Sequence, residues 1–191
     1  MEELEALVRP SGYFRQKARR LKDFVTFVDA RYGGSLEQMF ATPSEELRAE
    51  LLNQKGIGKE TADSILLYAG LRPVFVVDAY TRRIFERHRL VNASAKYDDI
   101  RLLAQDALAR EEVPPASHTN DRSVSPEKPP AHSPSAMSTA QQSTLVRVYN
   151  EMHGLIVQVG KHYCVKQHPH CDACPLGGML SAQQRARLQN F

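Results

Sequence analysis

The sequence of 191 residues predicts an all-α fold. Apolar residues recur at helical spacing over much of the chain, and residues that favour helix starts precede several of these segments. The one apolar stretch suited to a strand, 74–77, is isolated, and no partner strand is evident in the sequence. We therefore expect helices to form the core and residues 74–77 to form a buried extended connector.

Two short helices are expected in the first half of the chain. Thr42 is placed to cap the first, Pro43 suits its first helical position, and Glu45 completes a capping box. The second is expected over about 59–69, where apolar residues recur every three or four positions. Gly70 follows this segment and is suited to end it.

The second half of the chain predicts two further helices and an insertion. Asp78 is expected to cap a helix that begins directly after it. A long amphipathic helix is expected over about 145–163, with an apolar stripe of Leu145, Val148, Met152, Ile156, Val159 and Tyr163. Residues 112–144 are rich in Pro and Ser and contain no aromatic residue, so we expect a disordered insertion there.

Composition and charge restrict the class of protein. No apolar run reaches the roughly 20 residues that span a bilayer. The acidic N-terminus lacks the basic-then-apolar order of a secretory signal. We therefore expect a cytoplasmic protein with no membrane partner. The net charge of +3 is too small to indicate nucleic-acid binding by itself, although basic residues concentrate in 15–22 and 82–89.

Three cysteines, Cys164, Cys171 and Cys174, lie close together near the C-terminal end of the sequence. An odd, clustered number of cysteines without a signal peptide argues against a disulfide framework. Metal or iron–sulfur ligation is the favoured interpretation.

The segment Gly56-Ile57-Gly58 predicts a tight turn between two helices, with Ile57 turned into the core. Glycine lets the backbone turn and approach another surface closely. The free N–H groups of the following helix would suit one backbone phosphate, and Lys55 and Lys59 would add positive charge. A plain helix–helix turn is the alternative interpretation.

The surrounding sequence extends this pattern. Thr61-Ala62 and then Val77-Asp78 follow the glycines, and Ser11-Gly12-Tyr13-Phe14 precedes them. Together with the cysteine loop, these motifs resemble the helix-hairpin-helix and Gly/Pro-Asp signature of endonuclease III-like DNA glycosylases. The residues of these motifs are most similar to those of the endonuclease III-related branch, which includes 3-methyladenine glycosylases. The resemblance covers most of the chain outside 112–144.

The resemblance implies a helix-hairpin-helix DNA glycosylase fold. Residues 1–77 would form an incomplete helical barrel with the hairpin at about 51–66. Residues 78–111 and 145–191 would form a second helical lobe with the cysteine loop at 164–180. Because family members have further helices before the equivalent of Ser11, we expect that Met1 is a misplaced start or that the chain is a fragment. Part of the base pocket would then be missing.

The resemblance also implies base-excision repair by a monomer acting on double-stranded DNA that contains a damaged base. Asp78 occupies the position of the catalytic aspartate, where a carboxylate stabilises positive charge on the sugar and orients or deprotonates water. A helix cap is its alternative role. The implied DNA contacts are Lys55, Gly56, Ile57, Gly58, Lys59 and Thr61.

Glu60 departs from the bifunctional members of the family, which carry a lysine two residues after the second glycine. That amine forms a Schiff base with the sugar and cleaves the strand. A carboxylate cannot do so, and Lys59 lies about 100° around the helix. Hydrolysis without strand cleavage is therefore favoured. The alternatives are a bifunctional lyase and a non-catalytic DNA-binding remnant.

Leu180 stands where the family has the fourth cysteine of its cluster. A [4Fe–4S] cluster ordinarily has four protein ligands. We rank a cluster with a non-cysteine fourth ligand first and a partial or vestigial site second. Zinc bound with His162, His168 or His170 ranks third. His153, on the preceding helix, is expected to be a packed, hydrogen-bonded residue rather than a catalyst.

Overall fold

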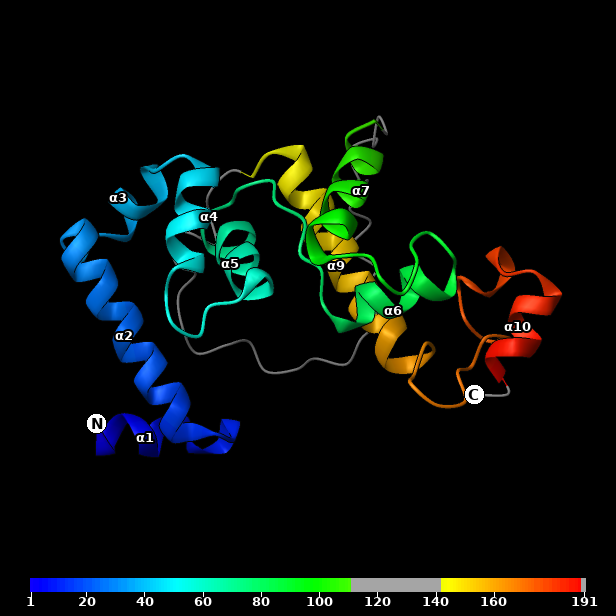
Figure 1. Cartoon of the computed structure of the whole chain (residues 1–191), viewed down its shortest axis with the longest axis horizontal. Coiled ribbons are helices and arrows are strands. Elements are labelled where there is room, and N and C mark those ends of the chain that lie inside the picture. The colour runs from blue at the N-terminus through cyan, green and yellow to red at the C-terminus, as the bar shows by residue number, and fades with distance from the viewer. Residues whose placement is uncertain (111–141, 190–191) are drawn as a thin grey trace, which may run out of the picture. The chain divides into compact units, whose positions relative to one another are not determined.

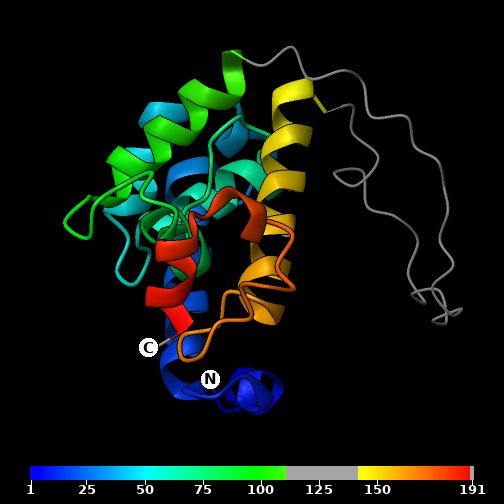
Figure 2. The same cartoon turned by 90° about the vertical axis from the view of Figure 1, so that its right-hand side faces the viewer.

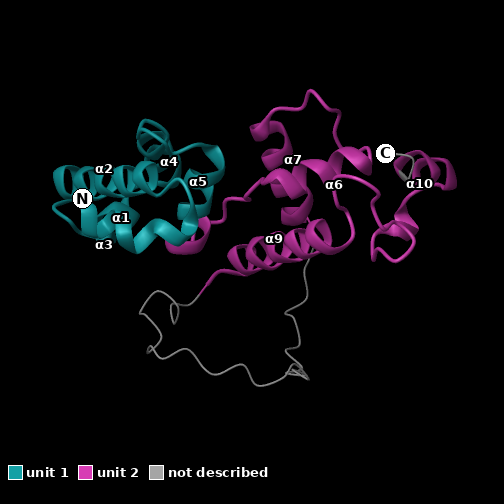
Figure 3. Ribbon diagram, turned by 90° about the horizontal axis from the view of Figure 1, so that it is seen from below, with its two compact units in different colours: residues 1–66 teal, residues 67–191 magenta. Residues whose placement is uncertain are grey.

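The computed structural model describes residues 1–110 and 142–189, and these residues form helices and no strand (Figure 1). The all-α prediction is confirmed. The chain divides into two compact units, residues 1–66 and 67–191 (Figure 3). The sequence suggested a boundary at 77/78, between the partial barrel and the second helical lobe. That boundary stays a prediction.

The first unit contains five α-helices and a short 3-10 helix within the described residues. They are α1 (Glu2–Val8), η1 (Arg9–Ser11), α2 (Phe14–Tyr32), α3 (Leu36–Ala41), α4 (Ser44–Leu52) and α5 (Lys59–Ser64). Helix α2 packs against α1 and α3, and α4 packs against α5. The buried apolar side chains include Ala18, Val28, Met39, Leu47, Leu51 and Ala62. The α4–α5 pair is the predicted helix-hairpin-helix.

The predicted capping box at Thr42 is wrong. Pro43 is the N-cap of α4 and its ψ of 142° is extended, so helical geometry begins only at Ser44. Thr42 instead ends α3, where its N–H donates to the carbonyl of Met39, and no side chain caps α4. Glu45 therefore lies one position too early in the helix to reach back to a cap.

The predicted helix over 59–69 is confirmed in extent, although its second half has a different winding. Helix α5 continues as a π-helix, η2 (Ile65–Ala69). This wider turn buries Leu66 and Leu67 and leaves Tyr68 42% exposed. The backbone then turns at Leu71, which has a positive φ of 51°.

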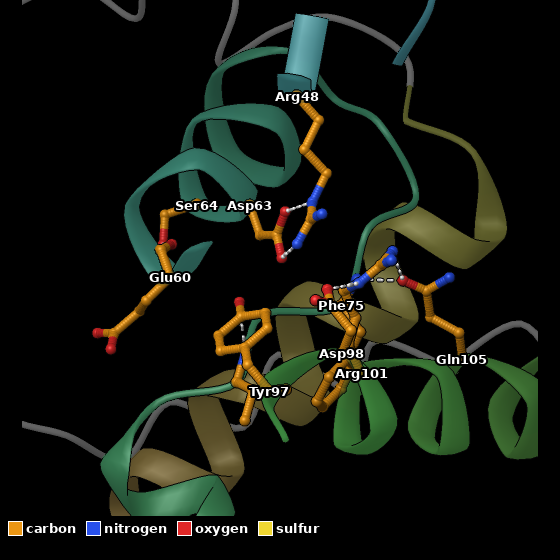
Figure 4. Close-up of polar contacts among 10 residues, drawn as sticks. Arg48, Glu60, Asp63, Ser64, Phe75, Tyr97, Asp98, Arg101 and Gln105 are labelled. Carbon is orange, nitrogen blue, oxygen red and sulfur yellow. Dashed lines mark hydrogen bonds and ion pairs between the residues drawn. The ribbon is translucent and has the colours of Figure 1, made fainter. Parts of the chain in front are cut away.

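Residues 74–77 form the buried extended connector that the sequence predicted. The backbone N–H of Phe75 donates to the side chain of Gln105 (3.1 Å), and that of Val77 donates to the Tyr97 hydroxyl (3.3 Å). Both partners lie on helix α7 (Tyr97–Arg110) (Figure 4). Side chains thus satisfy backbone groups that would otherwise require a partner strand.

The second unit also contains α6 (Ala79–Arg87), α9 (Thr144–His162), η3 (Gly177–Met179) and α10 (Ala182–Gln189). Helix α9 packs against α6 and α7 (Figure 2). The core of this unit includes Phe75, Val76, Ile84, Ile100, Val146 and Tyr149. No helix in the described ranges is long and apolar enough to cross a membrane.

The predicted starts of α6 and α9 are confirmed. Asp78 caps α6, and Ser143 caps α9 by accepting a hydrogen bond from Val146 N–H. The predicted disordered insertion lies mostly outside the described residues. Its last part does not, because Thr144 is already the first residue of α9.

Candidate active site and DNA-binding hairpin

The two glycines of the hairpin have different structural roles. Gly56 has a φ of +89°, and a Cβ atom there would overlap the side chain of Arg20. Gly58 caps α5 with a φ of −92°, and a Cβ atom there would meet nothing within 4 Å. Gly56 is therefore needed for the turn itself, whereas no described neighbour requires a glycine at position 58.

The predicted DNA contacts are mostly exposed. Lys55, Gly56, Gly58, Lys59 and Thr61 are exposed in the first unit. Ile57, expected in the core, is half-buried and lines a pocket of about 580 Å³ beside the hairpin with Leu21 and Phe24. The basic side chains of Lys17 and Arg20 line the same pocket.

A buried ion pair that sequence analysis missed joins the two helices of the hairpin. Arg48 of α4 donates from Nε to Asp63 Oδ1 (2.5 Å) and from Nη2 to Oδ2 (3.1 Å) (Figure 4). Asp63 is fully buried and Arg48 is 8% exposed. Arg48 lies between Leu47 and Ala49, and Asp63 lies between Ala62 and Ser64, a pattern that does not indicate an ion pair. The pair fixes α5 against α4.

Asp78 holds a carboxylate of fixed orientation at the start of α6. Its Oδ1 atom accepts hydrogen bonds from Thr81 N–H (2.7 Å) and from the Thr81 hydroxyl (2.9 Å). Thr81 is fully buried, and the Asp78 side chain is 12% exposed. Its second oxygen, Oδ2, faces His153 Nε2 at 3.8 Å. The cap thus uses one carboxylate oxygen and leaves the other outside the helix.

His153 is packed and hydrogen-bonded, as expected, and it also lies beside Asp78, which was not expected. Its Nδ1 atom lies 2.5 Å from the hydroxyl of Tyr68. Burial, and then the charge of Asp78, raise the pKa of the Tyr68 phenol above its usual value. We call these three side chains the Asp78–His153–Tyr68 row. Tyr68 carried no motif that the sequence could have shown.

Arginines of α6 hold the cysteine loop. Arg83 donates to the carbonyls of Gly160 (3.0 Å) and Cys164 (2.6 Å). Arg87 donates to the carbonyls of Val165 and Lys166 and to the sulfur of Cys164 (3.2 Å). Much of the basic stretch 82–89 is thus used inside the second unit rather than left on a solvated face.

Comparison with known proteins gives the family. Residues 1–110 match the model of the HhH-GPD superfamily base excision DNA repair proteins. The chain belongs to this superfamily. The resemblance to endonuclease III-like glycosylases and the helix-hairpin-helix glycosylase fold are thereby confirmed.

Individual superfamily members show the extent of the similarity. A Methanocaldococcus jannaschii protein, provisionally named a DNA repair glycosylase, is 37% identical over 92% of this chain and 64% of its own length. Endonuclease III of Thermotoga maritima is 23% identical over 91% of this chain and 60% of its own length. The chain thus spans less than two thirds of the length of these relatives.

Solved structures of the superfamily share the fold. The 3-methyladenine DNA glycosylase of H. pylori, bound to 1,N6-ethenoadenine, matches 84% of this chain and 62% of its own (TM-score 0.57, 29% identity). A trapped endonuclease III–DNA covalent intermediate matches 97% of this chain and 66% of its own with a TM-score of 0.63. At 20% identity, the latter shows the fold alone.

The described cysteine loop lacks the fourth ligand of the cluster that the resemblance implied. Burial and the neighbouring Cys164 and Cys174 raise the pKa of Cys171, so the three thiols are near one another. Within the described residues, however, no three His, Cys, Asp or Glu side chains are arranged to hold a metal ion. The fourth position, Leu180, is apolar and 5% exposed.

Two of the three histidines considered as zinc ligands have other hydrogen bonds. His162 Nε2 is hydrogen-bonded to the side chain of Gln158 (3.1 Å), and His170 Nδ1 donates to the carbonyl of His162 (3.2 Å). His168 lies in the same loop with a φ of 50°. The described geometry therefore assigns no metal-dependent step to this loop.

Glu60 is exposed in the first turn of α5. Its carbonyl accepts a hydrogen bond from the Ser64 hydroxyl (2.7 Å), an ordinary contact along the helix. The side chain at this position supplies no amine.

Proposed function

We propose that this protein is a monofunctional base-excision DNA glycosylase, with Asp78 as its catalytic carboxylate. The observation that carries the proposal is the unequal use of the two carboxylate oxygens. Thr81 holds Oδ1 with two hydrogen bonds, so the direction of Oδ2 is fixed. A helix N-terminus also favours the ionised form of a carboxylate. Both features suit a group that acts by its negative charge.

The chemistry follows from that charge. The damaged nucleotide leaves the base stack before reaction, because its glycosidic bond is otherwise inaccessible. When the bond between C1′ and the base breaks, the electron pair leaves with the base and positive charge develops on the sugar. Asp78 Oδ2 stabilises that charge. It then accepts a proton from the water that attacks C1′, which leaves an abasic site in an unbroken strand.

The absence of strand cleavage rests on Glu60. Cleavage by a Schiff base needs an amine at the sugar. Glu60 has no amine. Lys59 has one, but its side chain leaves the helix about 100° away from that of Glu60. We therefore expect hydrolysis to be the only reaction at this site.

Duplex DNA containing a damaged base is the proposed partner, bound by a monomer inside the cell. The proposed contacts are the exposed hairpin residues, with Lys55 and Lys59 supplying charge and the backbone around Gly58 approaching a phosphate. Ile57 and Thr61 would contact the DNA from the same turn. The open space around Gly58 supports this proposal, since no part of the first unit requires a glycine there for steric reasons.

The catalytic proposal is tested by Asp78→Asn on duplexes that each carry one damaged base, including 1,N6-ethenoadenine. The amide keeps the acceptor for the Thr81 cap but removes the charge. We expect the single-turnover rate of base release to fall by ~10²–10³ with little change in DNA affinity. Asp99→Asn is the matched control, because Asp99 accepts a backbone N–H at the start of α7. An unimpaired Asp78→Asn protein would contradict the assignment.

The reaction type and the DNA contacts have separate tests. Borohydride should trap no covalent protein–DNA adduct, and an adduct with the unmodified chain would exclude the monofunctional mechanism. Gly58→Val should weaken binding to all sequences alike, because phosphate contacts position the protein without reading sequence. Gly178→Val, at another glycine with no heavy atom within 4 Å of a Cβ, is its control. Equal affinity of the two variants in a salt titration would remove the hairpin from the interface.

A further inference from the structure

The Asp78–His153–Tyr68 row connects the proposed catalytic carboxylate to a half-exposed phenol through one imidazole. The three side chains come from the start of α6, from α9 and from η2. The side chains of His153 and Asp78 are 14% and 12% exposed, whereas Tyr68 is 42% exposed as a residue. Water therefore reaches the Tyr68 end of the row more readily than the carboxylate end.

We propose that His153 is a positioning residue for Asp78, and that Tyr68 sets the tautomer of His153 that performs this role. The inference rests on the proposed function, since it concerns the same carboxylate. It adds two residues to the reaction, neither of which touches the sugar.

The tautomer follows from the hydrogen bond at Nδ1. A neutral imidazole has one nitrogen that donates and one that accepts. The pKa of Tyr68 is raised, so its phenol keeps its proton and is able to donate to His153 Nδ1. The ring proton of a neutral His153 is then on Nε2, which faces Asp78 Oδ2. The opposite tautomer would turn the Nε2 lone pair toward the carboxylate and would be repelled.

The solitary position of Nε2 supports this arrangement. Nε2 of His153 is buried and has no hydrogen-bond partner among the residues that the structure describes. A buried polar atom without a partner is costly, and the nearest compensation is the negative charge of Asp78. This attraction requires a proton on Nε2 and is weaker for a bare lone pair.

The distance of 3.8 Å between His153 Nε2 and Asp78 Oδ2 also supports a positioning role. It exceeds the 2.7–3.2 Å of a normal N–H···O bond. A direct bond would occupy Oδ2 and weaken it as a partner for the sugar cation. At the observed distance, the Nε2–H dipole of His153 attracts the Asp78 carboxylate without a direct hydrogen bond. The lone pairs of Oδ2 therefore stay available for the substrate. Thr81 on Oδ1 and His153 beside Oδ2 together restrict rotation of the carboxylate.

The tautomer is tested without substrate by nitrogen NMR of the full chain labelled with ¹⁵N-histidine. At a pH where His153 is neutral, we expect Nδ1 to be the unprotonated nitrogen. Tyr68→Phe removes only the hydroxyl and should shift the ring toward a mixture of tautomers. Tyr149→Phe is the matched control, because it removes another hydrogen-bonded hydroxyl of the same unit, 3.4 Å from the Gln105 carbonyl. A proton on Nδ1 in the unmodified protein would overturn the proposal.

The positioning role is tested by single-turnover base release and DNA affinity measured together. His153→Leu should slow base release ~10-fold or more and change affinity less than about twofold, since a lost hydrogen-bond donor near a charge has about this effect. His153→Gln should recover part of the rate, because its amide can accept from Tyr68 and donate toward Asp78. Equal rates for the leucine and glutamine variants would reduce His153 to a packing residue.

The two experiments separate this inference from the proposed function. If the unmodified chain releases no base while NMR shows the expected tautomer, the glycosylase proposal fails and the row remains as a structural arrangement. If base release is normal but the His153 variants match the unmodified protein, the positioning proposal alone is overturned.

Discussion

The buried Arg48–Asp63 pair leads to the strongest stability prediction for the hairpin. Asp63→Ala removes the carboxylate that accepts two hydrogen bonds from Arg48, a side chain that is only 8% exposed. Removing one partner of a buried ion pair typically costs about 3–5 kcal/mol. Asp63→Asn should cost less, because its amide oxygen still accepts one of the two hydrogen bonds.

Hydrogen exchange with peptide resolution is the suitable assay, because the chain has two compact units and a single unfolding transition is not assured. Amides of α4 and α5 should exchange roughly 10²- to 4 × 10³-fold faster in Asp63→Ala, as the lost free energy requires. Those of α9 in the second unit should change far less. Glu46→Gln is the control, because its ion pair with Arg31 is 55% exposed on both sides and 3.9 Å long.

A loss below about 1 kcal/mol in Asp63→Ala would refute this reasoning. The same holds if Glu46→Gln and Asp63→Ala accelerate exchange equally. In either case burial would not be what makes the Arg48–Asp63 pair important, and packing of the apolar faces alone would have to hold α5 against α4.

Three further outcomes follow from the structure. Gly56→Ala should lower the free energy of unfolding in urea by about 1–2 kcal/mol, because φ is +89° there, whereas Gly58→Ala should change it little. Hydrogen bonds from Tyr32 and Arg31 lower the pKa of Glu50 below 4.5, so the stability they provide is present above that pH and is lost as pH falls through the lowered value. Glu50→Gln, which stays neutral, should therefore lose less stability between pH 5 and 2 in acid titrations of the urea midpoint. Iron and sulfide analysis of protein purified without oxygen should give less than one four-iron cluster per chain, because Leu180 supplies no fourth ligand.

The sequence predicted elements whose determinants are local. The helix over 59–69, the cap at Asp78 and the helix near 145–163 depend on spacing and capping within a few residues, and all three are present. The error at Thr42 has the same origin. Thr42 and Pro43 offer two adjacent starts, and only the extended ψ of Pro43 decides between them.

The contacts that the sequence did not predict join residues far apart in the chain. Tyr68 and His153 are separated by 85 positions, and neither belongs to a spacing pattern that would pair them. The arginines of 82–89 suggested a basic patch, because the sequence shows the charge of a side chain but not the direction in which it points. Arg87 reaches the carbonyl of Val165 only because α6 and the cysteine loop fold against each other. Such partners are set by tertiary packing rather than by local sequence.

The observed cap of Asp78 is compatible with its proposed catalytic role. A cap requires one acceptor atom in a fixed place, and a carboxylate has two. Once Thr81 holds Oδ1 by its N–H and its hydroxyl, the side chain cannot rotate without losing both bonds, and Oδ2 acquires a fixed direction. An asparagine or serine would cap the helix nearly as well, but neither would leave a negative oxygen on the outer side. The cap therefore explains a short polar residue at position 78, and only the charge on its second oxygen calls for aspartate.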